Sequence, residues 1–319
     1  MLSTLSPHSR AVLQAIFVTF LWSTSWVLIK IGLQDDIPPL TYAGLRYTLA
    51  FLCLLPLAVR KPQTMTALRG MTLGGWIRLF VLGFLFYAVT QGAQFIGLAN
   101  LPAINVNLLL SLQAIVVTLM GFLMLRERPT GVQWIGGAFY LLGVLVFFYP
   151  IVLPQGQVAA MVVVIAGVLA GSASTVLTRW ISLRNELSPL AITLVSMGVG
   201  SALLLGIGIA THGLPTLSLK SWLLIAWLAV VNTAFAFTLW NHTLRTLSAM
   251  ESSIVNNLMM IQIPILAWLF LGEGISLKSG IGFALAGVGI LIVQLRRVPK
   301  QIKGVIAEKQ RNRETEPMV

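Results

Sequence analysis

The sequence has very few charged residues: Asp, Glu, Lys and Arg make up 9% of its 319 residues, whereas 57% are hydrophobic. A water-soluble domain covers its surface with charged side chains, which account for roughly 25% of its residues. The composition therefore excludes a soluble domain and makes lipid the main solvent. In lipid every backbone polar group must be hydrogen-bonded within the protein, which leaves helices or closed barrels. The apolar runs are long and do not alternate with polar residues, so they predict helices.

Cysteine and histidine are also scarce. The single cysteine, Cys53, lies inside an apolar run, which excludes a disulfide framework and a cysteine-ligated metal. The only histidines, His8, His212 and His242, are far apart along the chain, so they indicate no catalytic or metal-binding cluster. The sequence contains no phosphate-binding loop and no acidic residue within the central spans. We therefore expect no cofactor, no metal and no enzymatic activity.

The net charge of +12 does not point to nucleic acid, because the basic residues are concentrated outside the apolar runs. Many fall in a basic tail, residues 296–319, and most of the others lie in short connections. If the N-terminus is cytoplasmic, only Lys30, Lys220 and Lys278 fall in segments outside the cell. The positive-inside rule then predicts a multi-pass protein of the cell inner (plasma) membrane with both termini, and the tail, in the cytoplasm.

Ten apolar runs are long enough to cross a bilayer, which takes about 20 residues per helix. They are residues 11–33, 40–59, 75–99, 101–125, 131–150, 157–181, 189–210, 220–244, 250–271 and 278–295. Helix-capping residues precede three of them: Asn100 with Pro102, Thr130 with Gln133, and Ser188 with Pro189. The fold class is therefore an all-α integral membrane protein of ten transmembrane helices, with no separate soluble domain.

The second half of the sequence repeats the first at an offset of 146 residues. Without a gap, the offset superimposes Trp76 on Trp222, Leu125 on Leu271, Glu127 on Glu273, Gly136 on Gly282 and Gly143 on Gly289. Each repeat, 1–150 and 157–295, contains five spans. Five is an odd number, so the second repeat is inverted in the membrane relative to the first.

Inverted repeats around a site near the membrane midplane are typical of secondary transporters that work by alternating access. The sequence therefore predicts transport of a small molecule. Two other classes stay open at this point: a membrane-embedded enzyme and a non-transporting membrane partner protein. A homodimer is also left open, since the Gly-rich tenth span and the pair Gly167 and Gly171 permit close helix contact.

The pattern within each repeat resembles a known family. Each half opens with a small, polar and aromatic helix (LWSTSWVLIKIGL in the first) and closes with Leu-x-Glu before a Gly-rich helix; Arg46-Tyr47 follows in the second span. This arrangement is similar to the EamA-like family of the drug/metabolite transporter superfamily. The resemblance implies a ten-helix inner-membrane carrier, commonly an exporter, for small metabolites, amino acids or drug-like amphipathic compounds. The second repeat has no counterpart of Arg46.

Polar and aromatic side chains at membrane depth are expected to face a substrate path. Helical spacing puts the third-span residues on one face, and the offset pairs them with residues of the eighth span. The fourth and ninth spans, and the first and sixth, are paired in the same way. The hypothesised substrate-binding residues are Ser23, Trp26, Tyr87, Gln91, Gln94, Asn107, Ser111, Ser174, Thr233, Phe237, Trp240 and Asn257. The alternative for each polar group is a hydrogen bond that only joins helices.

A further set is predicted to act in gating or in structure. It comprises Lys30, Arg46, Glu127, Glu273 and Pro264. Asp35 or Asp36 could pair with Lys30 or Arg46 in an outer gate. Pro264 leaves a helical carbonyl unbonded, which a neighbour must satisfy.

Overall fold

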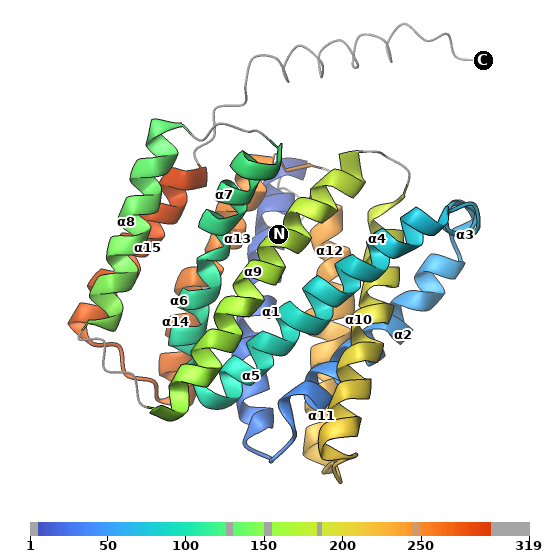
Figure 1. The fold of residues 1–319 in the computed structure, drawn as a ribbon, viewed down its shortest axis with the longest axis horizontal. Coiled ribbons are helices and arrows are strands. Elements are labelled where there is room, and N and C mark those ends of the chain that lie inside the picture. Colours follow the sequence, from blue (N-terminus) through green and yellow to red (C-terminus); the bar gives the residue numbers. More distant parts are fainter. Residues whose placement is uncertain are drawn as a thin grey trace, which may run out of the picture.

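In the computed structural model, residues 6–125, 130–149, 155–183, 187–244, 246–247 and 249–294 are described. All regular elements in these ranges are helices, and they form one bundle (Figure 1). Glu127 lies outside the described residues, as does the tail from residue 295.

The first half contains five membrane spans and one short connecting helix. Its elements are α1 (Pro7–Leu33), α2 (Pro39–Val59), the connecting helix α3 (Pro62–Arg69), a third span made of α4 (Leu73–Gly83), η2 (Phe84–Gln91) and α5 (Gly92–Asn100), a fourth made of α6 (Ala103–Ser111) and α7 (Gln113–Leu125), and α8 (Gly131–Phe148).

The second half repeats the order of the five spans, but the described connection between its second and third spans, residues 213–218, contains no counterpart of α3. Its elements are α9 (Gln155–Leu183), α10 (Pro189–His212), a span made of α11 (Leu219–Ala229), η3 (Val230–Phe235) and α12 (Ala236–Thr243), another made of α13 (Ala249–Asn257) and α14 (Met259–Leu271), and α15 (Leu277–Gln294). A helix therefore occupies each of the ten apolar runs. Within the described residues nine helices are long and apolar enough to cross a membrane, and Leu277–Ile292 is a shorter apolar helix.

The helix starts follow the sequence signals in two of three cases. Thr130 and Gln133 form the expected capping box, and the Ser188 side chain accepts a hydrogen bond at the start of α10. The prediction that Asn100 caps the fourth span is wrong, because its side chain donates backwards to the Ile96 carbonyl at 2.8 Å. A carboxylate from a distant loop takes its place, as described below.

Equivalent caps begin the third and eighth spans. Thr72 and Ser218, which are 146 residues apart, each accept a hydrogen bond from the backbone N–H three residues later. Four residues after each cap stands an exposed tryptophan, Trp76 or Trp222. Tryptophan favours the interface between lipid and water. Because the two spans run in opposite directions (Figure 1), the pair marks the two faces of the membrane.

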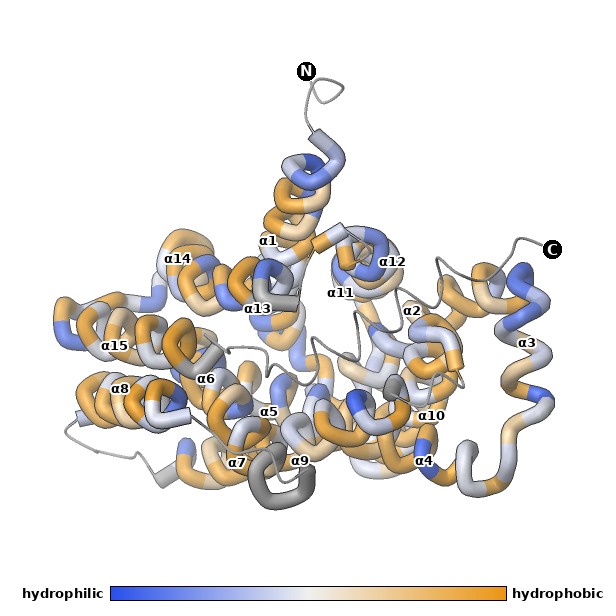
Figure 2. Tube along the Cα trace, turned by 90° about the horizontal axis from the view of Figure 1, so that it is seen from above, coloured by the Kyte–Doolittle hydropathy of each residue, from blue (hydrophilic) through white to orange (hydrophobic). Residues whose placement is uncertain are grey.

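Glycines show the inverted relationship directly where α8 packs against α15. A Cβ placed on Gly143 would lie 2.6 Å from the Gly282 carbonyl oxygen, and one on Gly289 would lie 2.6 Å from that of Gly136. The offset maps Gly143 onto Gly289 and Gly136 onto Gly282, so each close contact is the repeat image of the other. The glycines of the tenth span thus pack against α8 of the same chain, side by side in both views (Figure 2).

Helix irregularities also repeat at the same offset. The π-helical segments η2 and η3 begin at Phe84 and Val230. The fourth and ninth spans break at Leu112 and Leu258, where the backbone N–H bonds to the carbonyl three residues back. π-Helical turns often occur at functional sites. Both halves therefore place non-α backbone at equivalent depths in the spans nearest the bundle centre.

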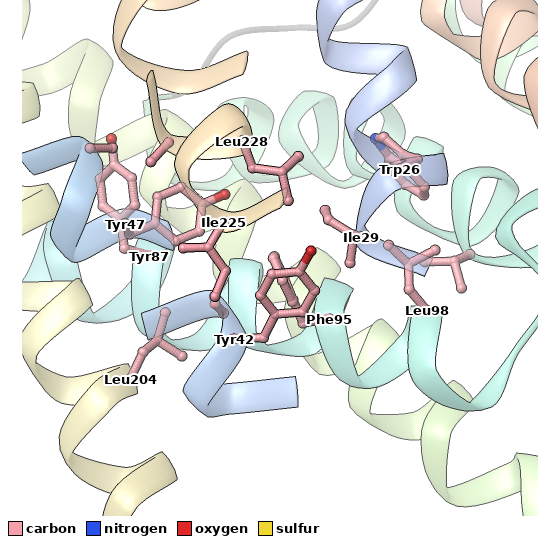
Figure 3. Packing of buried hydrophobic residues seen from close by; sticks show 14 of the residues in the cluster. Trp26, Ile29, Tyr42, Tyr47, Tyr87, Phe95, Leu98, Leu204, Ile225 and Leu228 are labelled. Atoms are coloured by element: carbon pink, nitrogen blue, oxygen red, sulfur yellow. The ribbon is translucent and has the colours of Figure 1, made fainter. Parts of the chain in front are cut away.

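The core lies between the two halves and is rich in aromatic residues (Figure 3). Tyr42 packs edge-on against Phe95, with ring centroids 5.4 Å apart, and both are fully buried. The outward surface is instead apolar and exposed, as on Phe80, Trp134 and Phe270. This inside-out pattern is what a protein solvated by lipid requires.

Candidate functional site

A cavity of about 400 Å³ lies among the third, sixth, seventh and eighth spans. It sits toward the end of the bundle at which α1, α4 and α10 begin, hereafter the N-terminal end. Its volume is in the range of small-molecule sites. The lining residues are Leu82, Phe86, Tyr87, Ser174, Thr175, Thr178, Arg179, Ile192, Thr193, Ser196 and Phe237.

One wall of the cavity carries hydroxyl groups. Helical spacing on α9 puts Ser174, Thr175 and Thr178 on one side, and Thr193 and Ser196 of α10 add two more hydroxyls. Each serine donates to a carbonyl of its own helix: Ser174 to Gly171 at 2.8 Å and Ser196 to Ile192 at 2.6 Å. A hydroxyl oxygen has two lone pairs, so it can still accept a hydrogen bond from a substrate.

Aromatic rings form the opposing wall. Phe86 and Tyr87 come from η2 and Phe237 from α12, so both halves contribute rings. Phe237 packs at a centroid distance of 5.4 Å against Trp22 of α1, which also lies 5.2 Å from Trp240. The combination suits an amphipathic molecule. The rings can pack against its apolar or cationic groups, and the hydroxyl oxygens can accept hydrogen bonds from its donor groups.

Behind this wall lies a buried polar cluster, comprising Arg46 and Tyr47 of α2, Gln91 of η2 and Thr233 of η3. Arg46 is 5% exposed; its Nε donates to the Thr233 hydroxyl at 3.2 Å and its guanidinium lies 5.1 Å from the Tyr47 ring centre. The Tyr47 hydroxyl donates to Gln91 Oε1 at 2.7 Å. Figure 3 shows Tyr47 beside Tyr87, and their centroids are 5.3 Å apart.

This cluster lies at the junction of the two repeats. Tyr87 and Thr233 are equivalent positions, 146 residues apart, in the middle of the third and eighth spans. Arg46 contacts one of them, and its neighbour Tyr47 contacts the other. Two consecutive residues of α2 thus join both halves at the depth where an inverted-repeat transporter holds its substrate.

Other hypothesised residues make contacts between helices. The Ser23 hydroxyl lies 2.8 Å from Gln262 Oε1 of α14 and 2.8 Å from the Thr19 carbonyl oxygen, so its one proton is shared between an acceptor of α14 and one of its own helix. Asn107 Nδ2 donates to the Met260 carbonyl oxygen at 3.4 Å, which is the carbonyl that Pro264 leaves without its helical partner. Ser111 donates to the carbonyl of Asn107 at 2.8 Å. The expected neighbour that satisfies the carbonyl freed by Pro264 is therefore Asn107.

The structure places the remaining residues as follows. Trp26 is buried in the main apolar cluster, Gln94 is buried in α5, Trp240 packs with α1, and Asn257 ends α13. Of the twelve hypothesised substrate-binding residues, Tyr87, Ser174 and Phe237 line the cavity. Tyr87, Gln91 and Thr233 are brought together around Arg46 and Tyr47. The others lie elsewhere along the bundle.

At the opposite end of the bundle lies a partly buried ion pair. Lys30 Nζ of α1 lies 3.6 Å from Glu273 Oε1 and also donates to the Leu101 carbonyl. The Glu273 carboxylate accepts the backbone N–H groups of Ala103 at 2.6 Å and Ile104 at 3.0 Å. It thereby caps α6, where a negative charge is favourable. Three separate segments are tied together at this end.

The expected pairing of Asp35 or Asp36 with Lys30 or Arg46 is wrong for Asp35. Its carboxylate accepts hydrogen bonds from Lys220 Nζ at 3.0 Å and from the Ser221 hydroxyl at 3.2 Å. Asp35 finds these partners because the C-terminal end of α1 lies beside the start of α11. The sequence alone does not show that these two helix ends are neighbours.

Several residues at the site were not singled out from the sequence. Gln262 is a glutamine inside an apolar span, so the rule that polar groups at membrane depth face a path would have found it. Thr178, Thr193 and Ser196 are ordinary hydroxyl residues in apolar helices, and no sequence signal distinguishes them from residues that only bond their own helix.

Comparison with known proteins agrees with this architecture. The EamA-like transporter family matches residues 9–149 and again residues 158–295. The chain belongs to this family. It is therefore a multi-pass membrane protein and a transporter of small metabolites. The two matches divide this EamA-like protein close to the boundary between its five-helix halves.

Two relatives illustrate the range of the family. The "Probable amino-acid metabolite efflux pump" of Escherichia coli K12 is 28% identical over 241 residues, covering 72% of this chain and 76% of that protein. The "Probable terminal-alkyne amino-acid exporter" of Streptantibioticus cattleyicolor is 25% identical over 92% of this chain and 96% of its own length. A solved structure, described only as "Crystal structure of protein", has a TM-score of 0.63 at 18% identity, covering 91% of this chain and all of that one. This structure supports the fold.

Proposed function

We propose that the protein is a secondary transporter that exports small amphipathic or zwitterionic metabolites, amino acids among them, by alternating access. Two relatives are named for amino-acid efflux or export, which supports this substrate class. The observation that carries the proposal is the asymmetry of the bundle: a cavity at the N-terminal end and a partly buried ion pair between helices at the other end. A carrier that works by alternating access needs one conformation that is open at this end only and a second conformation that is open at the other end only.

The proposal assigns the N-terminal end to the cytoplasm. Basic residues supply the reason, since Arg10, Arg60, Lys61 and Arg69 lie at that end, while Lys220 and Lys278 lie at the other. With this orientation the cavity receives its substrate from the cytoplasm. Opening of the Lys30–Glu273 end would then release the substrate outside.

The cavity chemistry selects the substrate class. Hydroxyl groups of α9 and α10 face aromatic rings of η2 and α12, and Arg179 is the one basic residue among the lining residues. Such walls suit a molecule with an apolar body and a few hydrogen-bonding groups. We therefore place amino acids and similar amphipathic metabolites ahead of highly charged solutes.

Flux in proteoliposomes tests the proposal. The full chain is reconstituted, and counterflow of labelled leucine, phenylalanine, threonine and choline is compared with that in empty liposomes. Phe237→Ala, which removes a cavity ring, should reduce flux of the transported amino acid roughly tenfold, equivalent to about 1.4 kcal/mol. Phe235→Ala is the matched control, because Phe235 is exposed on the same span and does not line the cavity. Equal flux for both variants, or no flux above empty liposomes, would refute the proposal.

A further inference from the structure

The strongest unexplained feature is the charge of Arg46. Its side chain is 95% buried at the junction of the repeats, yet within the described residues no carboxylate forms an ion pair with it. A buried cation without an anion carries a large desolvation cost. The Tyr47 ring, 5.1 Å away, offsets only part of that cost. If Arg46 served packing alone, burying an apolar side chain at this position would cost less free energy.

The hydrogen bonds of Arg46 leave its binding end free. Nε donates to the Thr233 hydroxyl, which itself donates to the Leu228 carbonyl at 2.8 Å and is thus fixed in orientation. In the described part of the chain the two terminal amino groups of the guanidinium have no hydrogen-bond partner. These two groups form the planar fork that binds a carboxylate through two parallel hydrogen bonds.

The fork lies next to the cavity. Thr233 is one helical turn from Phe237, which lines the cavity, and Tyr47 packs against Tyr87, which also lines it. Arg46 therefore contacts two residues, Thr233 and Tyr47, that neighbour lining residues of the cavity. A shift of Tyr87 or Phe237 would be needed to bring a molecule bound in the cavity into contact with the guanidinium. Both residues neighbour π-helical backbone, whose hydrogen bonds differ from those of the surrounding α-helix.

We propose that Arg46 is the anion-recognition residue of the transport site and binds the carboxylate of the substrate. The inference rests on the proposed function, because it names the group that the transported metabolite must carry. Bound carboxylate would supply the missing counter-charge. Since the second repeat has no counterpart of Arg46, the substrate would be held in one orientation in spite of the pseudo-symmetry of the helices.

Binding of three probes that share a phenyl group tests this assignment without depending on flux. They are L-phenylalanine, 3-phenylpropionate, which lacks the amine, and phenethylamine, which lacks the carboxylate. Affinity for the purified full-length protein is measured by calorimetry at pH 7. In the wild type both carboxylates should bind more tightly than phenethylamine. Arg46→Gln should weaken both carboxylates at least tenfold and leave phenethylamine within about twofold, and Arg46→Lys should retain part of the affinity.

Arg78→Gln is the matched control, since Arg78 is an arginine of the same half that stacks 4.8 Å from the Trp180 ring and lies outside the cluster. It should leave all three affinities unchanged. Equal losses for all probes in Arg46→Gln, no loss for any, or preference of the wild type for phenethylamine would overturn the proposal. So would failure of the wild type to bind any probe.

Flux separates this inference from the export proposal. If the binding pattern appears but no probe crosses proteoliposomes, the carboxylate subsite stands and export fails. If wild-type flux of L-phenylalanine is present and Arg46→Gln carries it at the same rate and affinity, transport stands and the subsite is overturned.

Discussion

Asn107 of α6 donates a hydrogen bond to the Met260 carbonyl of α14, the same carbonyl that Pro264 deprives of its helical partner. The proline and the asparagine therefore form a complementary structural pair across two spans of opposite halves. Each residue alone would be unfavourable in the membrane. Pro264 leaves the Met260 carbonyl without its helical hydrogen bond, and the Asn107 amide would lack a hydrogen-bond partner.

This pairing predicts non-additive mutational effects. Asn107→Leu should destabilise the protein by about 1–3 kcal/mol, since it leaves the Met260 carbonyl unbonded. Pro264→Ala restores the backbone N–H that bonds this carbonyl, so Asn107→Leu should cost much less in the Pro264→Ala background. Thermal unfolding in detergent measures all four proteins of the cycle. Additive effects would contradict the assignment of Asn107 as the partner of that carbonyl.

The glycine contacts between α8 and α15 predict a second, position-specific effect. Gly289→Ala places a Cβ 2.6 Å from the Gly136 carbonyl oxygen, so the helices must move apart, at a cost of about 1–3 kcal/mol. Gly137→Ala is the control, because no atom lies within 4 Å of its Cβ position and alanine favours helix. Unfolding midpoints should fall for the first variant and stay equal or rise for the second. The reverse order would refute the packing.

The ion pair at the closed end predicts a change in gating. Glu273→Gln removes the charge opposite Lys30 and weakens the cap of α6, so this end should open more readily. Lys30→Glu with Glu273→Lys should recover part of the closure that either single charge reversal loses. Labelling of a cysteine introduced at Leu98, in a Cys53→Ala background, reports opening from outside. Lys220→Ala, at an exposed pair, should have little effect on labelling.

Asp35 predicts a small dependence of stability on acid. The hydrogen bond from Lys220 lowers the pKa of its carboxyl below the usual value. A carboxyl with a lowered folded-state pKa stabilises the protein above its unfolded pKa of about 3.9 and loses this contribution as the pH falls through the folded value. Asp35→Asn should therefore lose less stability than the wild type between pH 5 and pH 3. Parallel pH profiles of the unfolding temperature would contradict this.

Much of the architecture follows from the sequence, because lipid imposes strong rules. Apolar run length locates the spans, and the glycines and the Leu-x-Glu pattern at one offset reveal the inverted repeat. The site follows less well. Spacing groups Tyr87 with Gln91, but the π-helical turn and the neighbouring α2 decide that both contact Tyr47. Asp35 bonds to Lys220 and Ser221 and not to Lys30 or Arg46, because sequence does not show which loops meet at the end of a bundle.

Hydroxyl residues also show that the sequence does not identify which side chains line the cavity. Ser174 lines the cavity and Ser23 bonds to α14, although the repeat offers both as candidates for the same role. Both side chains also bond their own helices, so the residue type and its spacing do not separate them. The positions of the neighbouring helices decide which of the two serines lines the cavity.

Sided labelling of Ser174→Cys in a Cys53→Ala background tests alternating access most directly. Ser174 lines the cavity at the N-terminal end, so a membrane-impermeant thiol reagent should modify the cysteine from the cytoplasm. Opening the other end with Glu273→Gln should reduce this labelling and raise labelling from outside. Modification from both sides at once, or an unchanged side preference when the ion pair is broken, would contradict the account.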